Sequence, residues 1–76
     1  MKFEVGSIYT RPGLFGPSWY VTCMARTENT ATFAQTGYEQ DLEDWATIEI
    51  LIDTSGTEIC ECYEYMKHKG YIRADR

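Results

Sequence analysis

The segment Asp53–Gly56 separates two runs that are rich in apolar residues, and this pattern constrains the fold more than any other. Residues 48–52 have isoleucine at every second position, and residues 59–62 contain one isoleucine and two cysteines. A short turn that ends in glycine between two such runs is typical of a β-hairpin. The sequence therefore predicts a domain built mainly from β-strands.

Further strands are predicted along the chain from the alternation of β-favouring residues. The predicted strands cover residues 3–10, 18–26, 30–36 and 45–52, with a bend at Gly6 and Ser7. Residues 11–17 contain two prolines and two glycines, which predicts a loop. Residues 18–26 carry apolar side chains on both faces, which is typical of a central strand. Residues 37–44 are a polar, acidic connection.

The segment 57–69 fits two structures. As a helix it places apolar residues at the spacings i, i+3, i+4 and i+7, Ser55 and Glu58 match a capping box, and Gly70 would be the C-terminal cap. As a strand it pairs with residues 48–53. We favour a strand as far as Cys62, one short helical turn or loop around residues 63–69, and a last strand at 71–74.

These elements predict a single small domain over residues 1–76. The expected fold is mainly β: a five- to six-stranded antiparallel sheet, either an SH3-like barrel or a curved sheet, with one short helical turn near the C-terminus. A chain of this length buries only about 60% of its unfolded surface. Its core must therefore use large side chains, and the chain supplies two Trp, six Tyr and three Phe.

The chain reads as a soluble, cytoplasmic protein. It has no apolar run near the roughly 20 residues that a membrane span needs, and its N-terminus lacks the pattern of a signal peptide. Its three cysteines are an odd number, and Cys60 and Cys62 are too close together to close a useful disulfide loop. We expect reduced thiols that pack as small apolar groups.

The acidic balance of the chain argues against direct binding to nucleic acid, and no contact with a membrane is expected. The formal net charge is -5, from twelve acidic and seven basic residues. Affinity for a phosphate backbone comes mainly from lysine and arginine. The acids gather in the 37–44 connection and again over residues 58–64, whereas the bases gather near the C-terminus.

Neither catalysis nor metal binding is predicted. His68 is the only histidine, and no nucleophile is tied to it by a recognised motif. There is no glycine-rich phosphate loop. Cys23, Cys60, Cys62 and His68 could supply zinc ligands, but a Cys-x-Cys pair is not the usual zinc spacing. We expect no enzyme activity, no metal and no cofactor.

Two stretches of the sequence are similar to known proteins. The segments 5–9 and 26–33, the latter reading RTENTATF, resemble a hairpin pattern of small uncharacterised proteins from phages and other mobile elements of gut Firmicutes. The closing residues 65–66 and 71–76 also look like the end of those proteins. The resemblance implies no activity or cofactor. Asp41, Glu43 and Asp44 stand where those proteins often have basic residues, which argues against a nucleic-acid role.

The remaining prediction is a protein-binding surface. Apolar residues at the tip of the 11–17 loop, and an aromatic residue among the acids of the 37–44 connection, are typical of interaction sites. The candidate partner-binding residues are Leu14, Phe15, Tyr38, Glu39, Asp41, Glu43 and Asp44. We expect a protein partner, with a basic nucleic-acid-handling protein as one candidate. The alternative is a homodimer or larger self-assembly, in which an edge strand around Leu51 pairs with a second copy.

Overall fold

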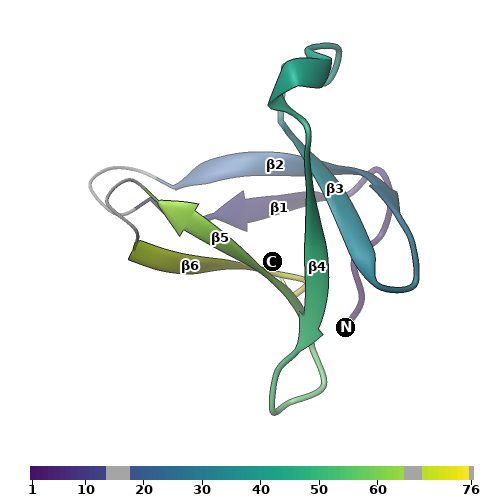
Figure 1. Cartoon of the computed structure of the whole chain (residues 1–76), viewed down its shortest axis with the longest axis vertical. Helices are drawn as coiled ribbons and strands as arrows, with labels where there is room; N and C mark the ends of the chain where they lie inside the picture. The colour runs from purple at the N-terminus through teal and green to yellow at the C-terminus, as the bar shows by residue number, and fades with distance from the viewer. Residues whose placement is uncertain (14–17, 65–67, 76) are drawn as a thin grey trace.

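The computed structural model describes residues 1–13, 18–64 and 68–75, and these residues form one curved antiparallel sheet (Figure 1). The strands follow the order of the chain, so that each pairs with the next along the sequence. The elements are β1 Ile8–Arg11, β2 Trp19–Arg26, β3 Thr30–Gln35, the 3-10 helix η1 Leu42–Asp44, β4 Ala46–Ile52, β5 Glu58–Glu64 and β6 His68–Arg73. Because β1 also contacts β6, the sheet curls into a nearly closed barrel.

The mainly β fold predicted from the sequence is confirmed. β2 lies between β1 and β3, as expected of a strand with apolar residues on both faces. The bend at Gly6 is also present, because this residue has φ +90° and Ser7 N–H donates to the Glu4 carbonyl at 3.1 Å. Residues 3–7 precede β1 rather than forming its first half, so this strand is shorter than predicted. No helix in the described ranges has the length and apolar character needed to cross a membrane.

The predicted hairpin at Asp53–Gly56 is present, and its turn is organised by one carboxylate. Asp53 Oδ1 accepts hydrogen bonds from the N–H groups of Ser55 and Thr57 and from the Ser55 hydroxyl. Gly56 has φ +85°, a left-handed conformation that favours glycine. The other carboxylate oxygen of Asp53 accepts from Arg73 Nη2 at 2.7 Å, so the turn is tied to β6.

The prediction of a short helical turn around residues 63–69 is wrong for the part of this segment that the structure describes. β5 continues to Glu64 and β6 begins at His68; residues 65–67 lie outside the described ranges. Gly70 does not cap a helix but pairs with Cys62 in the β5–β6 ladder. A Cβ on Gly70 would lie 2.9 Å from Pro12 Cγ, so the glycine allows β1 to approach β6. The helical turn of the described chain is η1, in the acidic connection.

The core is built around three aromatic rings and three thiols. Phe3 contacts Tyr9 and Phe33 edge to face, with ring centroids 5.0 and 5.2 Å apart. The cysteines are free and buried, as predicted. Burial raises the pKa of Cys60 to about 12, so this thiol stays protonated and packs as a small apolar group.

Glu58 joins the N-terminal segment, β2, β5 and the C-terminal residues. Its carboxylate accepts the N–H of Phe3 at 2.8 Å and both terminal nitrogens of Arg26 at 2.7 and 3.0 Å. Arg26 Nη1 also donates to the Phe3 carbonyl at 2.8 Å. The Glu58 carbonyl accepts the N–H of Ala74, and its N–H donates to the Met1 carbonyl. The hydrogen bonds from Arg26 hold the pKa of Glu58 below its usual value.

We expect Asp53 to make the fold sensitive to strong acid. The hydrogen bonds from Ser55, Thr57 and Arg73 lower the pKa of Asp53 from 3.8 to about 2. A lowered pKa means that the ionised form stabilises the fold. This contribution is complete above pH 3.8 and is lost as pH falls through about 2.

The Asp53→Asn variant should therefore be less stable than the native protein at pH 5. The gap between their melting temperatures should narrow as pH falls toward 2, which thermal unfolding followed by circular dichroism at several pH values would measure. Glu58 titrates in both proteins and so cancels in the comparison. A gap that stays constant from pH 5 to about 2 would contradict the role of the Asp53 carboxylate.

Candidate functional site

The connection between β3 and β4 protrudes from the barrel, and we call residues 37–45 the acidic knob (Figure 1). Its backbone is braced by local hydrogen bonds. Tyr38 N–H donates to the Gln35 carbonyl at 2.9 Å, and Asp41 N–H donates to the Tyr38 carbonyl at 3.0 Å. The indole Nε1 of Trp45 donates to the Glu39 carbonyl at 2.7 Å. The knob is therefore an ordered protrusion with its own internal bonding.

Within the knob, Glu39 differs from the other acids. Its carboxylate accepts the N–H of Gly37 at 3.0 Å and the hydroxyl of Thr22 at 3.2 Å. Hydrogen bonds from its own N–H and from Gly37 lower the pKa of Glu39. This half-buried carboxylate ties the knob to β2, which the sequence pattern did not indicate.

The other candidate residues of the knob face solvent together. Tyr38 is 52% exposed and Leu42 is 69% exposed. Exposed acids surround them: Asp41, Glu43 and Asp44. The structure thus brings five of the predicted partner-binding residues onto one protrusion: Tyr38, these three acids, and Glu39, whose carboxylate is bonded to Thr22. Leu14 and Phe15, the other predicted contact residues, lie outside the described residues.

Next to the knob, β4 and β5 separate. They pair only from Ile50↔Cys60 to Ile52↔Glu58, beside their hairpin. Among the described residues, positions 46–49 of β4 pair with β3 alone, and positions 61–64 of β5 pair with β6 alone. Figure 1 shows the two strands meeting at the hairpin and diverging from it. We call the space between the diverging halves the β4–β5 cleft.

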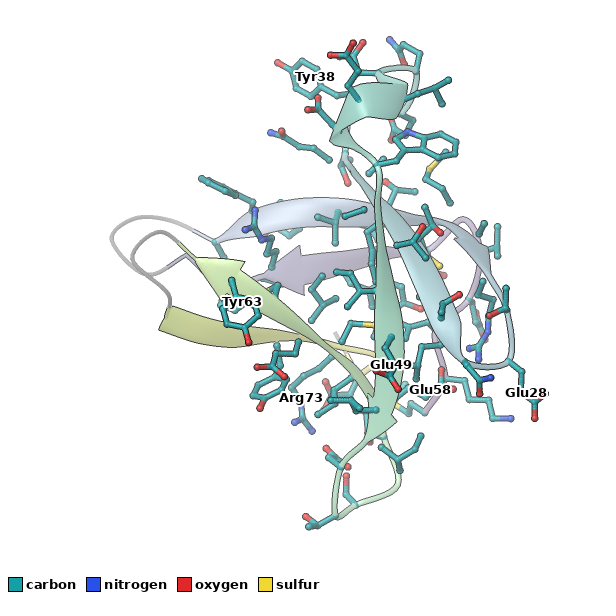
Figure 2. The ribbon with its side chains drawn as sticks, in the orientation of Figure 1. Glu28, Tyr38, Glu49, Glu58, Tyr63 and Arg73 are labelled. Carbon is teal, nitrogen blue, oxygen red and sulfur yellow. The ribbon has the colours of Figure 1, made fainter. Side chains whose placement is uncertain are left out.

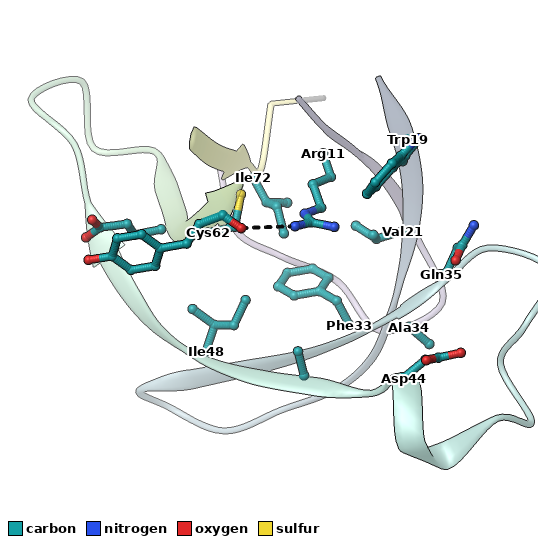
Figure 3. Close-up of a pocket in the computed structure, with 13 residues that line it drawn as sticks. Arg11, Trp19, Val21, Phe33, Ala34, Gln35, Asp44, Ile48, Cys62 and Ile72 are labelled. Carbon is teal, nitrogen blue, oxygen red and sulfur yellow. Dashed lines mark hydrogen bonds between the residues drawn. The ribbon is translucent and has the colours of Figure 1, made fainter. Parts of the chain in front are cut away.

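The β4–β5 cleft contains a cavity of about 460 Å³. Its floor is apolar, and Figure 3 shows Val21, Phe33, Ile48 and Ile72 pointing into it. The rim is polar and includes Gln35, Glu61 and Asp44. Asp44 belongs to the acidic knob as well, so the knob and the cleft form one continuous surface.

Arg11 spans the opposite side of the cavity. Its guanidinium carbon lies 5.1 Å from the centroid of the Trp19 ring, a cation–π distance. Arg11 Nη2 donates to the Tyr63 carbonyl at 3.2 Å, which places a side chain against the edge of β5 (Figure 3). Trp19 is 47% exposed and lines the cavity together with Val21.

The chemistry that this surface offers is binding. It combines apolar area, exposed carboxylates and two strand edges. Within the described ranges, no three His, Cys, Asp or Glu side chains are grouped as a metal site requires. The cleft itself had no signal in the sequence, because alternation predicts which face a residue occupies and not where two paired strands part.

Comparisons with known proteins found no matching family model, no similar curated protein and no similar solved structure. The function of the chain is therefore inferred from the acidic knob and the β4–β5 cleft.

Proposed function

We propose that this protein is a small acidic protein–protein interaction module without catalytic activity. The observation that carries the proposal is the acidic knob, on which Tyr38, Leu42 and three carboxylates are exposed on an internally bonded protrusion. An aromatic side chain supplies contact area at low entropic cost, and the acids select a basic surface. The proposed partner is a basic protein.

The net charge supports the choice of partner. A chain with a formal charge of -5 is attracted to basic surfaces and repelled by nucleic acid. Proteins that handle nucleic acids carry such basic surfaces. We therefore propose an inhibitor or accessory protein of a cytoplasmic nucleic-acid-handling protein, encoded by a phage or mobile element. The size of the barrel suits an SH3-like module, although a fold of this kind hosts many functions.

The second candidate function is self-assembly. The edge strand expected around Leu51 is not an edge, because Leu51 pairs with Ile59 of β5, so an assembly would use other exposed side chains. Ile52 at the end of β4, and Tyr63 and Tyr71 on β5 and β6, are large apolar or aromatic side chains that are exposed in the monomer. A homo-oligomer could cover them. Light scattering after gel filtration would separate the candidates. Self-association that persists at high salt favours assembly, whereas a monomer at all concentrations favours a separate partner.

The knob is tested by reversing its charge. We expect the double variant Asp41→Lys/Glu43→Lys to capture about tenfold less of a basic partner from a lysate of the native host, since two favourable charges become repulsive. Capture by the native chain should fall when salt rises from about 50 mM to about 500 mM.

The matched control is Glu4→Lys/Glu28→Lys, which changes the net charge equally at exposed positions outside the knob. Figure 2 shows Glu28 at the end of the molecule away from Tyr38. This control should retain capture. Equal losses in both double variants would mean that only net charge matters. Capture that neither variant weakens would contradict a docking role for the knob.

A further inference from the structure

We propose that the β4–β5 cleft binds an extended, basic segment of the partner protein. The segment pairs with the open edge of β4 and places one large apolar side chain in the cavity. This inference rests on the proposed function, because the segment belongs to the partner that the acidic knob contacts. Three observations support it: the strand edges, the apolar floor and the charge of the rim.

The strand edges favour an extended peptide over a compact ligand. Residues 46–49 of β4 have a ladder partner on the β3 side and, among the described residues, none on the β5 side. The backbone groups on such an edge can pair with an added strand, a common mode of peptide recognition. The edge of β5 is different, because Arg11 Nη2 donates to the Tyr63 carbonyl. We therefore assign the pairing to β4.

The cavity provides a place for one anchoring side chain. Its volume of about 460 Å³ lies within the usual range of ligand sites. The side chains of Phe33 and Ile48 form part of its floor. Ala46 pairs with Phe33 in the β3–β4 register, so its methyl group shares this face and leaves room above the floor. A phenylalanine or leucine that projects from a strand added to β4 would bury apolar area here.

The charge of the rim selects a basic segment. Asp44 lines the cavity just before β4, and exposed Glu49 ends the open stretch on the opposite face of that strand. Arg11, the base among the described lining residues, is engaged with Trp19 and the Tyr63 carbonyl. On an added strand whose phenylalanine enters the cavity, the alternating lysines point to the face of Glu49. A second copy of this chain is a poorer match, because two molecules of charge -5 repel each other.

The probe for this proposal is a synthetic peptide of about seven residues in which lysine and valine alternate around a central phenylalanine. Isothermal titration calorimetry at low salt should detect binding to the native chain. A peptide with alternate backbone amides methylated cannot pair with a strand edge, and a peptide with glutamate in place of lysine has the wrong charge. Both control peptides should bind at least about tenfold more weakly.

The protein variant Ala46→Phe fills the space above the floor and should weaken peptide binding about tenfold. Its control is Ala25→Phe, which makes the same substitution at an exposed position of β2 that does not line the cavity. We expect this control to bind within about twofold of the native chain. Melting temperatures verify that both variants fold, and the methylated peptide tests the pairing without any variant.

The outcomes separate this inference from the proposed function. No binding of the lysine peptide, or equal binding of the methylated peptide, overturns the cleft inference, while knob-dependent capture of a partner would leave the proposed function intact. If the peptide binds but the knob variant captures as much partner as the native chain, the result supports the cleft inference and contradicts the docking role of the knob. Dimers of the native chain that Ala46→Phe abolishes would identify a second copy as the occupant and overturn the basic segment.

Discussion

Replacing Glu58 with alanine should cost about 3 kcal/mol or more in the free energy of unfolding, a large part of the total stability of a domain this small. Glu58 is 5% exposed and accepts hydrogen bonds from Phe3 N–H and from both terminal nitrogens of Arg26. The substitution leaves the guanidinium without its ion-pair partner and a buried N–H without an acceptor. The N-terminal segment, which carries Phe3 into the core, should detach first.

Urea unfolding of the purified variant measures this loss. The control is Asp75→Ala, which breaks an exposed ion pair with Arg73 at 3.3 Å and should cost less than about 1 kcal/mol. Glu58→Gln should fall between the two, because an amide oxygen can still accept from Phe3 N–H. A loss below about 1 kcal/mol in Glu58→Ala would contradict the role of this network.

Replacing Phe33 with alanine should cost about 3–5 kcal/mol and leave the chain largely unfolded at room temperature. Phe33 is 3% exposed, and its ring contacts those of Phe3 and Tyr9 edge to face at 5.2 and 6.3 Å. Removing the ring leaves a void that three strands and the N-terminal segment cannot close without moving their backbones. The void also opens into the β4–β5 cavity, whose floor Phe33 helps to form.

Two variants calibrate the effect of Phe33→Ala. Phe33→Leu keeps most of the apolar volume and should cost less than about 1.5 kcal/mol. Tyr38→Ala removes an exposed ring from the acidic knob and should change stability by less than about 0.5 kcal/mol. Thermal and urea unfolding measure all three. A Phe33→Ala variant as stable as Phe33→Leu would show that the aromatic cluster is not the centre of the core.

The strands were predictable because alternation and turn residues are local signals. Asp53–Gly56 carries both the hydrogen-bonding aspartate and the glycine of its turn, so its hairpin could be inferred without knowing the rest of the fold. The C-terminal region was not predictable in the same way. Residues 59–66 satisfy a helical period, and only pairing with β4 and β6 makes residues 59–64 a strand. In the sequence, Gly70 resembles a helix cap. Its role in the structure is to leave room for Pro12, and this contact between distant residues has no local signal in the sequence.

The candidate site was predictable in part for a similar reason. Exposed acids next to Tyr38 mark a surface loop in any fold, so the knob could be found from the sequence. The structural role of Glu39 depends on Thr22, seventeen positions away, and that of Glu58 on Arg26, thirty-two positions away. The cleft depends on the register at which β4 and β5 part. Such long-range geometry has no counterpart in the periodicity of a single chain.

The knob and the cleft give the proposed partner two contacts of different character. The knob presents charge and an aromatic ring, which act early in an encounter and respond to salt. The cleft presents a strand edge and an apolar cavity, which act once the partner is in place. Asp44 lies in both surfaces. A basic, extended segment that enters the cleft would therefore pass directly beside the acids of the knob.

The most direct test of this combined surface is a nuclear magnetic resonance titration of the isotope-labelled chain with the lysine–valine–phenylalanine peptide. We predict that the backbone amide shifts change most at residues 46–49 of β4 and at Asp44, with smaller changes in the rest of the knob. The changes should weaken as salt rises. Shift changes confined to the outer faces of β1 and β2, or no change at any peptide concentration, would contradict a peptide-binding surface formed by the acidic knob and the β4–β5 cleft.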